Sequence, residues 1–360
     1  MTVPVDGTAN SSTSTGTSTG TSSVAERLSA FARAVSGESR STLLAERDDG
    51  IVVGSGDVVA KAHAADSDRS ALEARLAVAA HPLLHGVLLP PLPPPRMPQE
   101  PGPAPAPAPA VPPPREGRPP AVPAAPAALH DVLDGRPVTV WPRGVPVDRD
   151  DPGAAPWEEA ARLLARLHRT PVDALPGPLP PMRGPGKVAR ALHRMRAAAP
   201  PTPASRAVLA AHALLPAWAR AQAAPPPADF LCHGDLHLGQ LVRHPRPGGR
   251  WLLIDVDDLG TGDPAWDLAR PASWYATGLL APEEWGRFLH AYRLAGGPAV
   301  PADGDPWPRL DVPARALTVQ SAALALARAA GLGRDPDEVE QCLVDACARM
   351  GTAAAPPDVL

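Results

Sequence analysis

Apolar positions recur at helical spacing through much of the chain, and short alternating stretches lie near its beginning. Residues 24–35 (VAERLSAFARAV) repeat apolar side chains every three or four positions, which predicts an amphipathic helix. The runs STLLAE, IVVG and DVVAKAH are typical of strands; a helix over about 69–80 and a further strand, HGVLLP, follow. The segment VLDGRPVTVWPRG predicts a hairpin that turns at Asp134 and Gly135. We therefore expect a small α+β lobe at residues 24–144.

From Pro156 onward the pattern is helical. Three amphipathic segments are separated by proline-rich joints: WEEAARLLARLHRT, GKVARALHRMRAAA and SRAVLAAHALLPAWARAQ. A strand-like stretch, DFLCHGDLHLGQLVRH to RWLLIDVDD, interrupts the helices, which resume in EEWGRFLHAYRLA, ARALTVQSAALALARAA and DEVEQCLVDACARM. Residues 145–350 are therefore expected to form a larger helical lobe that carries one β-hairpin loop, before a flexible tail at 351–360.

Two segments have no apolar pattern to bury. Residues 1–23 form a Ser/Thr/Gly tract that is typical of a disordered tail. Between residues 90 and 126, 18 of 37 positions are proline, which predicts a polyproline-like excursion without a core. A tolerated insertion into the small lobe explains this segment better than a docking site for a protein partner.

Composition narrows the class of protein. The net charge of −4 gives no basic field for nucleic acid or for an anionic membrane. The three cysteines form no Cys-x-x-Cys pair, and no signal peptide or membrane-length apolar run is evident, so we expect a cytoplasmic protein. Only Lys61 and Lys187 are lysines among 34 basic residues. A lysine retained among so many arginines suggests a role for a compact point charge, which directs attention to Lys61.

The stretch HGDLHLGQ, residues 233–240, concentrates polar groups next to predicted strands. A metal-dependent hydrolase is one interpretation, because His233, Asp235 and His237 would share one face of a strand. The other histidines show no ligand spacing, which disfavours it. A phosphatase with Asp255 as nucleophile and Asp257 as acid/base is a second interpretation. It lacks the lysine that such enzymes need downstream.

A third interpretation, phosphoryl transfer from ATP, gives a role to the polar residues of this stretch and of the strand that follows it. It requires a carboxylate for the acceptor hydroxyl, oxygen ligands for Mg²⁺ and a cation for the phosphates. Asp235 offers the carboxylate, Gln240 an amide oxygen, and Asp255 a second metal ligand after the apolar strand WLLI. A loop, a strand, a tight turn and a second strand would bring these three residues together.

The motifs resemble those of the aminoglycoside phosphotransferase superfamily of small-molecule kinases. HGDLHLGQ, LLIDVDD and GTGDPAWDLA are similar to its three successive motifs. The resemblance implies a bilobal, protein-kinase-like α+β fold with a small β-sheet lobe and a mostly helical lobe. It assigns the catalytic base to Asp235 and the Mg²⁺ ligands to Gln240 and Asp255.

The resemblance extends to the loop supports and the small lobe. It implies that His233, Asp263 and Asp267 hold the catalytic loop. It also implies that Lys61, in DVVAKAH, binds the α- and β-phosphates of ATP with Glu73 as its ion-pair partner. TVWPRG resembles the strand and hinge that hold adenine, and GIVVGSGD resembles the phosphate-covering hairpin.

The acceptor is less defined. Gln240 stands where most of the superfamily has Asn, and HGDLHLGQ is similar to the bacterial maltokinase and glucosamine kinase branch. GTGDPAWDLA is more like the general aminoglycoside-type pattern. The prediction is an ATP-dependent phosphotransferase that acts on a hydroxyl of a sugar, amino sugar or aminoglycoside. The alternative is a catalytically silent, nucleotide-binding regulator.

Three further sets of residues have structural interpretations that we prefer. Trp266, Trp274 and Trp285 are expected in the core and not in a sugar-stacking wall, because they lie in helical segments. Asp258 is expected to cap the turn after Asp255. The acidic loop at 303–311 is expected to be solvated.

Overall fold

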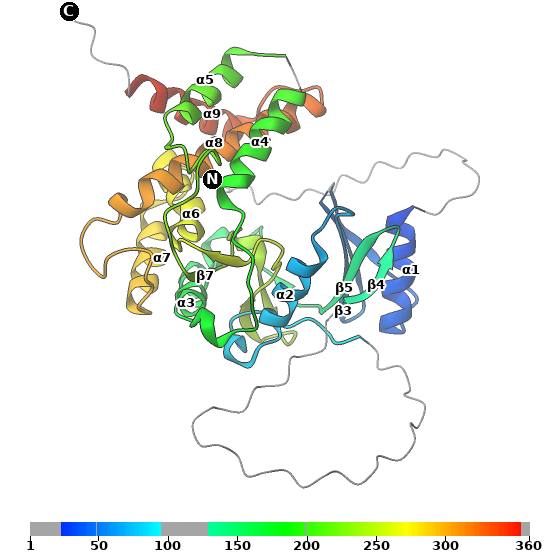
Figure 1. Ribbon diagram of the computed structural model, residues 1–360. Helices are drawn as coiled ribbons and strands as arrows, with labels where there is room; N and C mark the ends of the chain where they lie inside the picture. Colours follow the sequence, from blue (N-terminus) through cyan, green and yellow to red (C-terminus); the bar gives the residue numbers. More distant parts are fainter. Residues whose placement is uncertain (1–22, 48, 95–128, 199, 354–360) are drawn as a thin grey trace, which may run out of the picture. The chain divides into compact units, whose positions relative to one another are not determined.

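The computed structural model describes residues 23–47, 49–94, 129–198 and 200–353, which fall into two compact units (Figure 1). The smaller unit contains described residues from 23–81, 90–94 and 129–142, and the larger one contains 82–89 and 143–353. The predicted tails and the proline-rich segment lie largely outside the described residues. Among the helices described, none has the length and hydropathy required to cross a membrane.

The smaller unit is built on an antiparallel sheet. Its described strands follow the order β1-β2-β3-β5-β4. Two helices accompany them. The bounds are α1 Val24–Ser36, β1 Thr42–Arg47, β2 Gly50–Ser55, β3 Val58–His63, α2 Arg69–Ala79, β4 Leu129–Leu133 and β5 Arg136–Pro142.

Helix α1 packs on one face of this sheet, as Figure 1 shows. It starts with a capping box in which Ser23 and Glu26 exchange hydrogen bonds of 2.8 and 3.2 Å. Ala60 and Ala62 of β3 are buried in the same hydrophobic cluster as α1. Because successive strand side chains point to opposite faces, Lys61 lies on the sheet face away from α1.

The predicted hairpin is confirmed, but one predicted strand is wrong. Strands β4 and β5 turn at Asp134 and Gly135, whose φ angles of 51° and 75° suit a left-handed two-residue turn. The segment HGVLLP instead follows a short 3-10 helix, η1 (Pro82–Leu84), and makes only isolated bridges. Leu89 N–H donates to the Leu253 carbonyl at 2.9 Å, and the next two prolines have no N–H with which to extend a ladder.

The larger unit is mainly helical and contains two small antiparallel sheets, β10-β7 and β6-β8-β9. The bounds of its helices are η2 Pro152–Ala154, α3 Trp157–His168, η3 Val172–Ala174, α4 Gly184–Ala198, α5 Pro203–Ala213, η4 Leu238–Gln240, α6 Ala265–Thr277, α7 Pro282–Leu294, α8 Trp307–Gly331 and α9 Glu338–Ala353. The bounds of its strands are β6 Val145–Pro146, β7 Phe230–Cys232, β8 Leu241–His244, β9 Arg250–Leu253 and β10 Gly260–Gly262.

Helices α4, α5, α8 and α9 share one hydrophobic core (Figure 1). Trp266 of α6 belongs to it, and Trp274 and Trp285 are also buried, so the three tryptophans lie in the interior as predicted. The helix predicted over 205–222 is wrong in its second half, because α5 ends at Ala213. Pro216 lacks the N–H that would continue the helix.

The two small sheets determine where the polar stretch HGDLHLGQ, residues 233–240, lies. β7 ends at Cys232, directly before His233, and η4 leads into β8. The hairpin β8–β9 then returns the chain to Asp255, and β10 precedes α6. The predicted fold class is confirmed: a small unit with an antiparallel sheet and a larger, mostly helical unit.

Candidate active site

The loop after β7 is held by one buried carboxylate. The backbone N–H groups of His233 and Gly234 donate to the two oxygens of Asp267 at 2.6 and 2.7 Å. Asp267 lies in the first turn of α6 and is 1% exposed. This pair of charge-assisted hydrogen bonds fixes the backbone immediately before Asp235.

Gly234 is required by the same loop geometry. Its φ of 83° is in the left-handed region, which favours glycine. A Cβ atom at this position would lie 2.3 Å from the backbone oxygen of Asp258. The loop can therefore pass this close to the chain after β9 only with glycine here.

The two histidines of HGDLHLGQ make structural contacts. His233 is buried, and its Nε2 donates to the Ile254 carbonyl at 2.8 Å, which links the loop to the end of β9. His237 accepts a hydrogen bond from Gly239 N–H on Nδ1 at 3.0 Å and begins η4. These bonds give no support to the metal-hydrolase interpretation.

Asp267 is also the end of a chain of hydrogen bonds through His168 and Tyr292. Ala299 N–H donates to the hydroxyl of Tyr292 at 3.0 Å, and this hydroxyl lies 2.7 Å from His168 Nδ1. His168 Nε2 lies 2.9 Å from Asp267 Oδ2. A neutral His168 that donates from Nε2 and accepts on Nδ1 satisfies every step, so the network assigns this tautomer.

This network argues against a metal between His168, Cys232 and Asp267, whose ligand atoms lie within 4.8 Å of one another. Both ring nitrogens of His168 already have hydrogen-bond partners. Burial raises the pKa of Asp267, but the hydrogen bonds from the His168 ring and from the His233 backbone outweigh it and lower the pKa below its usual value. Asp267 is thus ionised where it holds the loop.

Gln240 and Asp255 meet at the end of the β8–β9 hairpin. Gln240 Nε2 lies 3.4 Å from Asp255 Oδ2, and Ile254 N–H donates to the Gln240 carbonyl at 2.9 Å. Rotating the side-chain amide by 180° would present Oε1 to the same space. Two neighbouring ligands of an octahedral Mg²⁺ lie about 3 Å apart. The pair therefore fits a hard divalent cation.

Asp255 has an unusual backbone. Its φ of 63° is in the left-handed region, where residues other than glycine are uncommon, although Asn, Asp and His are the most frequent among them. Such backbone strain concentrates at functional sites. It turns the chain sharply after β9 and sets the carboxylate beside Gln240.

Asp235 is held by two cations from different helices. Lys187 Nζ of α4 and Arg270 Nη2 of α6 each lie 2.8 Å from Asp235 Oδ1. Burial alone raises the pKa of Asp235, but the positive charges of Lys187 and Arg270 outweigh it and hold the pKa well below its usual range. Asp235 is consequently a carboxylate at neutral pH, oriented before any substrate binds.

The prediction that Asp258 caps a turn missed its main contacts. Its carboxylate lies 2.7 Å from Lys187 Nζ and 2.6 Å from Arg183 Nε. Arg183 also donates to the Asp257 carbonyl at 2.7 Å. Asp258 thus joins the segment after Asp255 to the start of α4, a contact that no local pattern reveals.

The remaining predicted residues have the following positions. Asp263 Oδ1 accepts from Ala265 N–H at 3.0 Å and lies 3.4 Å from Arg309 Nη2, at the start of α6. In the smaller unit, Lys61 lies on β3. Glu73 of α2 contacts Arg69 Nε at 3.1 Å. The pairing of Lys61 with Glu73 stays a prediction.

Lys187 and Arg270 were not predicted as site residues. Lys187 had one sequence signal, its survival as a lysine among 32 arginines, but its position in an amphipathic segment offered no further clue. Arg270 directly follows DLA and had no signal.

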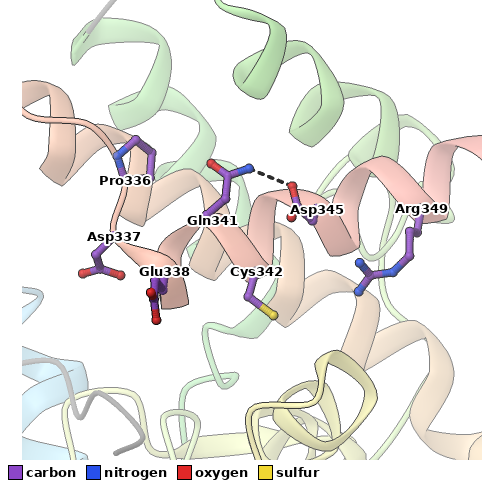
Figure 2. Close-up of a pocket in the computed structure, with 7 residues that line it drawn as sticks. All are labelled: Pro336, Asp337, Glu338, Gln341, Cys342, Asp345 and Arg349. Atoms are coloured by element: carbon purple, nitrogen blue, oxygen red, sulfur yellow. Dashed lines mark hydrogen bonds between the residues drawn. The ribbon is translucent and has the colours of Figure 1, made fainter. Parts of the chain in front are cut away.

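Two surface hollows lie away from this cluster. One, of about 440 Å³, lies on α9 and the residues before it. Figure 2 shows the residues that line it: Pro336, Asp337, Glu338, Gln341, Cys342, Asp345 and Arg349. The other, of about 500 Å³, lies among α6, α8 and α9 and includes Trp307, Asp311 and Arg315. Neither is lined by a residue of the HGD loop.

Comparisons with known proteins agree with this geometry. Residues 33–311 match the model of the phosphotransferase enzyme family (APH). The apo structure of a thermostable mutant of aminoglycoside phosphotransferase APH(4)-Ia has a TM-score of 0.54 at 15% identity, covering 91% of this chain and 100% of that chain. Another mutant of that enzyme, in a ternary complex with AMP-PNP and hygromycin B, has a TM-score of 0.53 at 16% identity, with coverages of 91% and 99%.

A choline/ethanolamine kinase family protein from Mesorhizobium loti has a TM-score of 0.48 at 15% identity, covering 93% of this chain and 96% of that chain. A comparison with curated proteins gave no match. At these identities the structural likeness establishes the fold alone. The family match, by contrast, runs through Lys61, the HGD loop, Asp255 and Asp267. The chain therefore belongs to the phosphotransferase enzyme family, as its motifs predicted, and is a small-molecule kinase.

Proposed function

We propose that this enzyme transfers the γ-phosphoryl group of ATP to a hydroxyl of a small molecule, of the sugar, amino sugar or aminoglycoside class. One observation carries the proposal. The carboxylate of Asp235 is held ionised by Lys187 and Arg270, on a loop whose backbone is fixed by Asp267. A fixed carboxylate is the group that phosphoryl transfer requires to orient an acceptor hydroxyl.

In this mechanism Asp235 accepts a hydrogen bond from the acceptor hydroxyl and receives its proton as the new P–O bond forms. Both cations contact Oδ1, so the hydroxyl is expected to donate to Oδ2. The low pKa of Asp235 makes it a weak base. Its main contribution is therefore orientation, with proton transfer late in the reaction.

Gln240 and Asp255 are proposed to hold Mg²⁺. When bound, the ion would offset the negative charge of the ATP phosphates. Lys61 is proposed to bind the α- and β-phosphates, with Glu73 as its partner. His233, Asp263 and Asp267 are proposed to support the loop, in keeping with their contacts to Ile254, to the start of α6 and to the loop backbone.

The acceptor class is supported by the family and by the loop motif. The APH(4)-Ia mutant of similar fold was crystallised with hygromycin B, which agrees with a hydroxylated, sugar-like acceptor without identifying it. The HGDLHLGQ loop favours a sugar or an amino sugar. Both belong in one screen.

The test is ADP release from the purified full chain with Mg-ATP, across glucosamine, maltose, glucose, homoserine, choline, kanamycin and hygromycin B. Mass spectrometry identifies any phosphorylated acceptor. Asp235→Asn is run beside Asp173→Asn, which alters an exposed carboxylate on η3. We expect one acceptor to be phosphorylated, with turnover lost in Asp235→Asn and kept in Asp173→Asn. Equal turnover by Asp235→Asn would contradict the role given to this loop.

A further inference from the structure

Lys187 is one of the two lysines in the chain, and it lies at the catalytic carboxylate. Its Nζ is 2.8 Å from Asp235 Oδ1 and 2.7 Å from Asp258 Oδ2. Its side chain is 16% exposed, so the ammonium group lies largely out of bulk solvent. In such surroundings a charge acts more strongly on neighbouring groups than it does in water.

The surrounding structure holds Lys187 in place from both sides. Its neighbours Val188, Ala191 and Leu192 on α4 are buried in the core shared with α8. Asp258 binds the ammonium group and is itself paired with Arg183 at 2.6 Å. The position of Nζ is therefore set by packing and by charge before any substrate binds.

A lysine ammonium has three N–H donors. Within the described residues, carboxylates of Asp235 and Asp258 engage two of them. One donor remains, on a cation that already touches the carboxylate proposed to bind the acceptor hydroxyl. The acceptor hydroxyl would be hydrogen-bonded to Asp235, and the phosphorus that it attacks would lie about 3 Å from its oxygen. Both atoms would therefore be within a few ångströms of the Lys187 ammonium group.

We propose that Lys187 is a catalytic residue, whose remaining N–H donates to an oxygen of the phosphoryl group during its transfer. The proposal rests on the proposed phosphotransferase function. In the step, the acceptor oxygen forms a bond to the γ-phosphorus while the bond from that phosphorus to the β–γ bridging oxygen breaks. The bridging oxygen leaves on ADP, and the acceptor proton passes to Asp235. Lys187 gains and loses no proton, and it offsets charge on the oxygens of the moving phosphoryl group.

Arg270 is assigned a different role, although it contacts the same oxygen of Asp235. Its Nε also donates to the Leu236 carbonyl at 3.2 Å, so its guanidinium holds the backbone of the loop as well as the carboxylate. It is a positioning residue. The compact ammonium group of Lys187 can follow the phosphoryl group during transfer better than the planar guanidinium of an arginine can.

The experiment compares Lys187→Met and Lys187→Arg with Arg190→Met, which removes an exposed charge from the same helix. Thermal unfolding first confirms that each variant is folded. The acceptor found in the screen is then used for kcat and KM, with hydrolysis of ATP by water as the basal reaction. Affinities for ADP alone and for ADP with aluminium fluoride, a mimic of the phosphoryl group in transit, are measured by calorimetry.

Loss of one preorganised donor to a developing charge costs about 10²–10³ in kcat. We expect that loss in Lys187→Met and a parallel loss of affinity for ADP with aluminium fluoride, but not for ADP alone. The acid limb of the pH profile of kcat/KM should move to higher pH, because Asp235 would lose one of the two cations that contact it and keep only Arg270. Lys187→Arg should lose less, and Arg190→Met should behave as wild type.

Each outcome decides the proposal. A Lys187→Met protein with wild-type kcat, mimic affinity and acid limb would overturn it and leave the proposed function intact. If the wild type binds nucleotide without transferring phosphate, the mimic affinity alone decides. If the wild type binds neither nucleotide nor mimic, the proposed function fails, and this proposal fails with it.

Discussion

His168 and Asp267 are 99 positions apart in the chain, yet Nε2 of one lies 2.9 Å from Oδ2 of the other in the interior of the larger unit. The bond joins α3 to α6. Because Asp267 also accepts hydrogen bonds from the backbone N–H groups of His233 and Gly234, one side chain ties the HGD loop to two helices. The stability of the unit and the geometry of the loop are thus coupled.

Asp267→Asn should lower the stability of the larger unit and disturb the geometry of the loop. One carboxylate oxygen becomes an amide NH₂ that faces a donor, which leaves a buried donor unpaired. We expect a loss of about 3 kcal/mol in the free energy of unfolding, or about 6–12 °C in melting temperature. Calorimetry checks the stability, and turnover should fall with it. Asp173→Asn is the matched control, and an Asp267→Asn protein as stable as that control would contradict the assignment.

Stability should decline in acid. The pKa values of Asp235 and Asp267 are lowered in the folded protein, so the unfolded chain binds protons more readily at these two groups. Their contribution is present above the unfolded pKa of about 3.9 and is lost as the pH falls through the folded values. Melting temperatures of the wild type and of Asp267→Asn should therefore converge as the pH is lowered from 7 toward 3. A constant difference would contradict this linkage.

Gly234→Ala should be severely destabilising for its size. The new Cβ would lie 2.3 Å from the Asp258 backbone oxygen, and φ is 83°. We expect a loss of about 3 kcal/mol or more, together with loss of turnover. Gly286→Ala, in α7, meets nothing within 4 Å and should be neutral or stabilising by up to about 1 kcal/mol. Urea unfolding of both variants checks the contrast.

Gln240→Leu should raise the Mg²⁺ concentration needed for half-maximal activity by about tenfold or more, because an oxygen ligand is removed. Gln240→Asn keeps an amide oxygen and should show a smaller shift. Gln341→Leu alters an exposed amide on α9 and should show none. Titration of turnover with Mg²⁺ at saturating ATP makes the measurement. No shift in Gln240→Leu would remove this residue from the proposed metal site.

Lys61→Met should weaken ATP binding. A charge-assisted hydrogen bond to phosphate contributes about 1.5–3 kcal/mol, which corresponds to a rise of about 10- to 100-fold in Kd for ATP. Lys61→Arg keeps the charge and should lose less affinity. Calorimetric titration with ATP provides the values. Unchanged affinity in Lys61→Met would contradict the role inferred from the DVVAKAH strand.

Much of the fold could be predicted because its signals are local. Alternating apolar and polar residues predicted β1 to β3, and the turn at Asp134–Gly135 predicted the β4–β5 hairpin. Apolar residues at helical spacing predicted α1, α3 and α4. The two errors have local causes. Pro216 prevents α5 from continuing, and Pro90 and Pro91 have no N–H with which HGVLLP could extend a ladder.

Sequence motifs alone were enough to predict the family, the fold class, the HGD loop with Asp235 and Gln240, and the hairpin that leads to Asp255. Those residues are close enough along the chain for one loop and one hairpin to relate them. The tertiary structure alone decided which side chains surround Asp235. Lys187 and Arg270 come from α4 and α6, and their charged ends meet on one carboxylate only after both helices pack on α8. No spacing in the sequence encodes a contact that depends on how three helices pack.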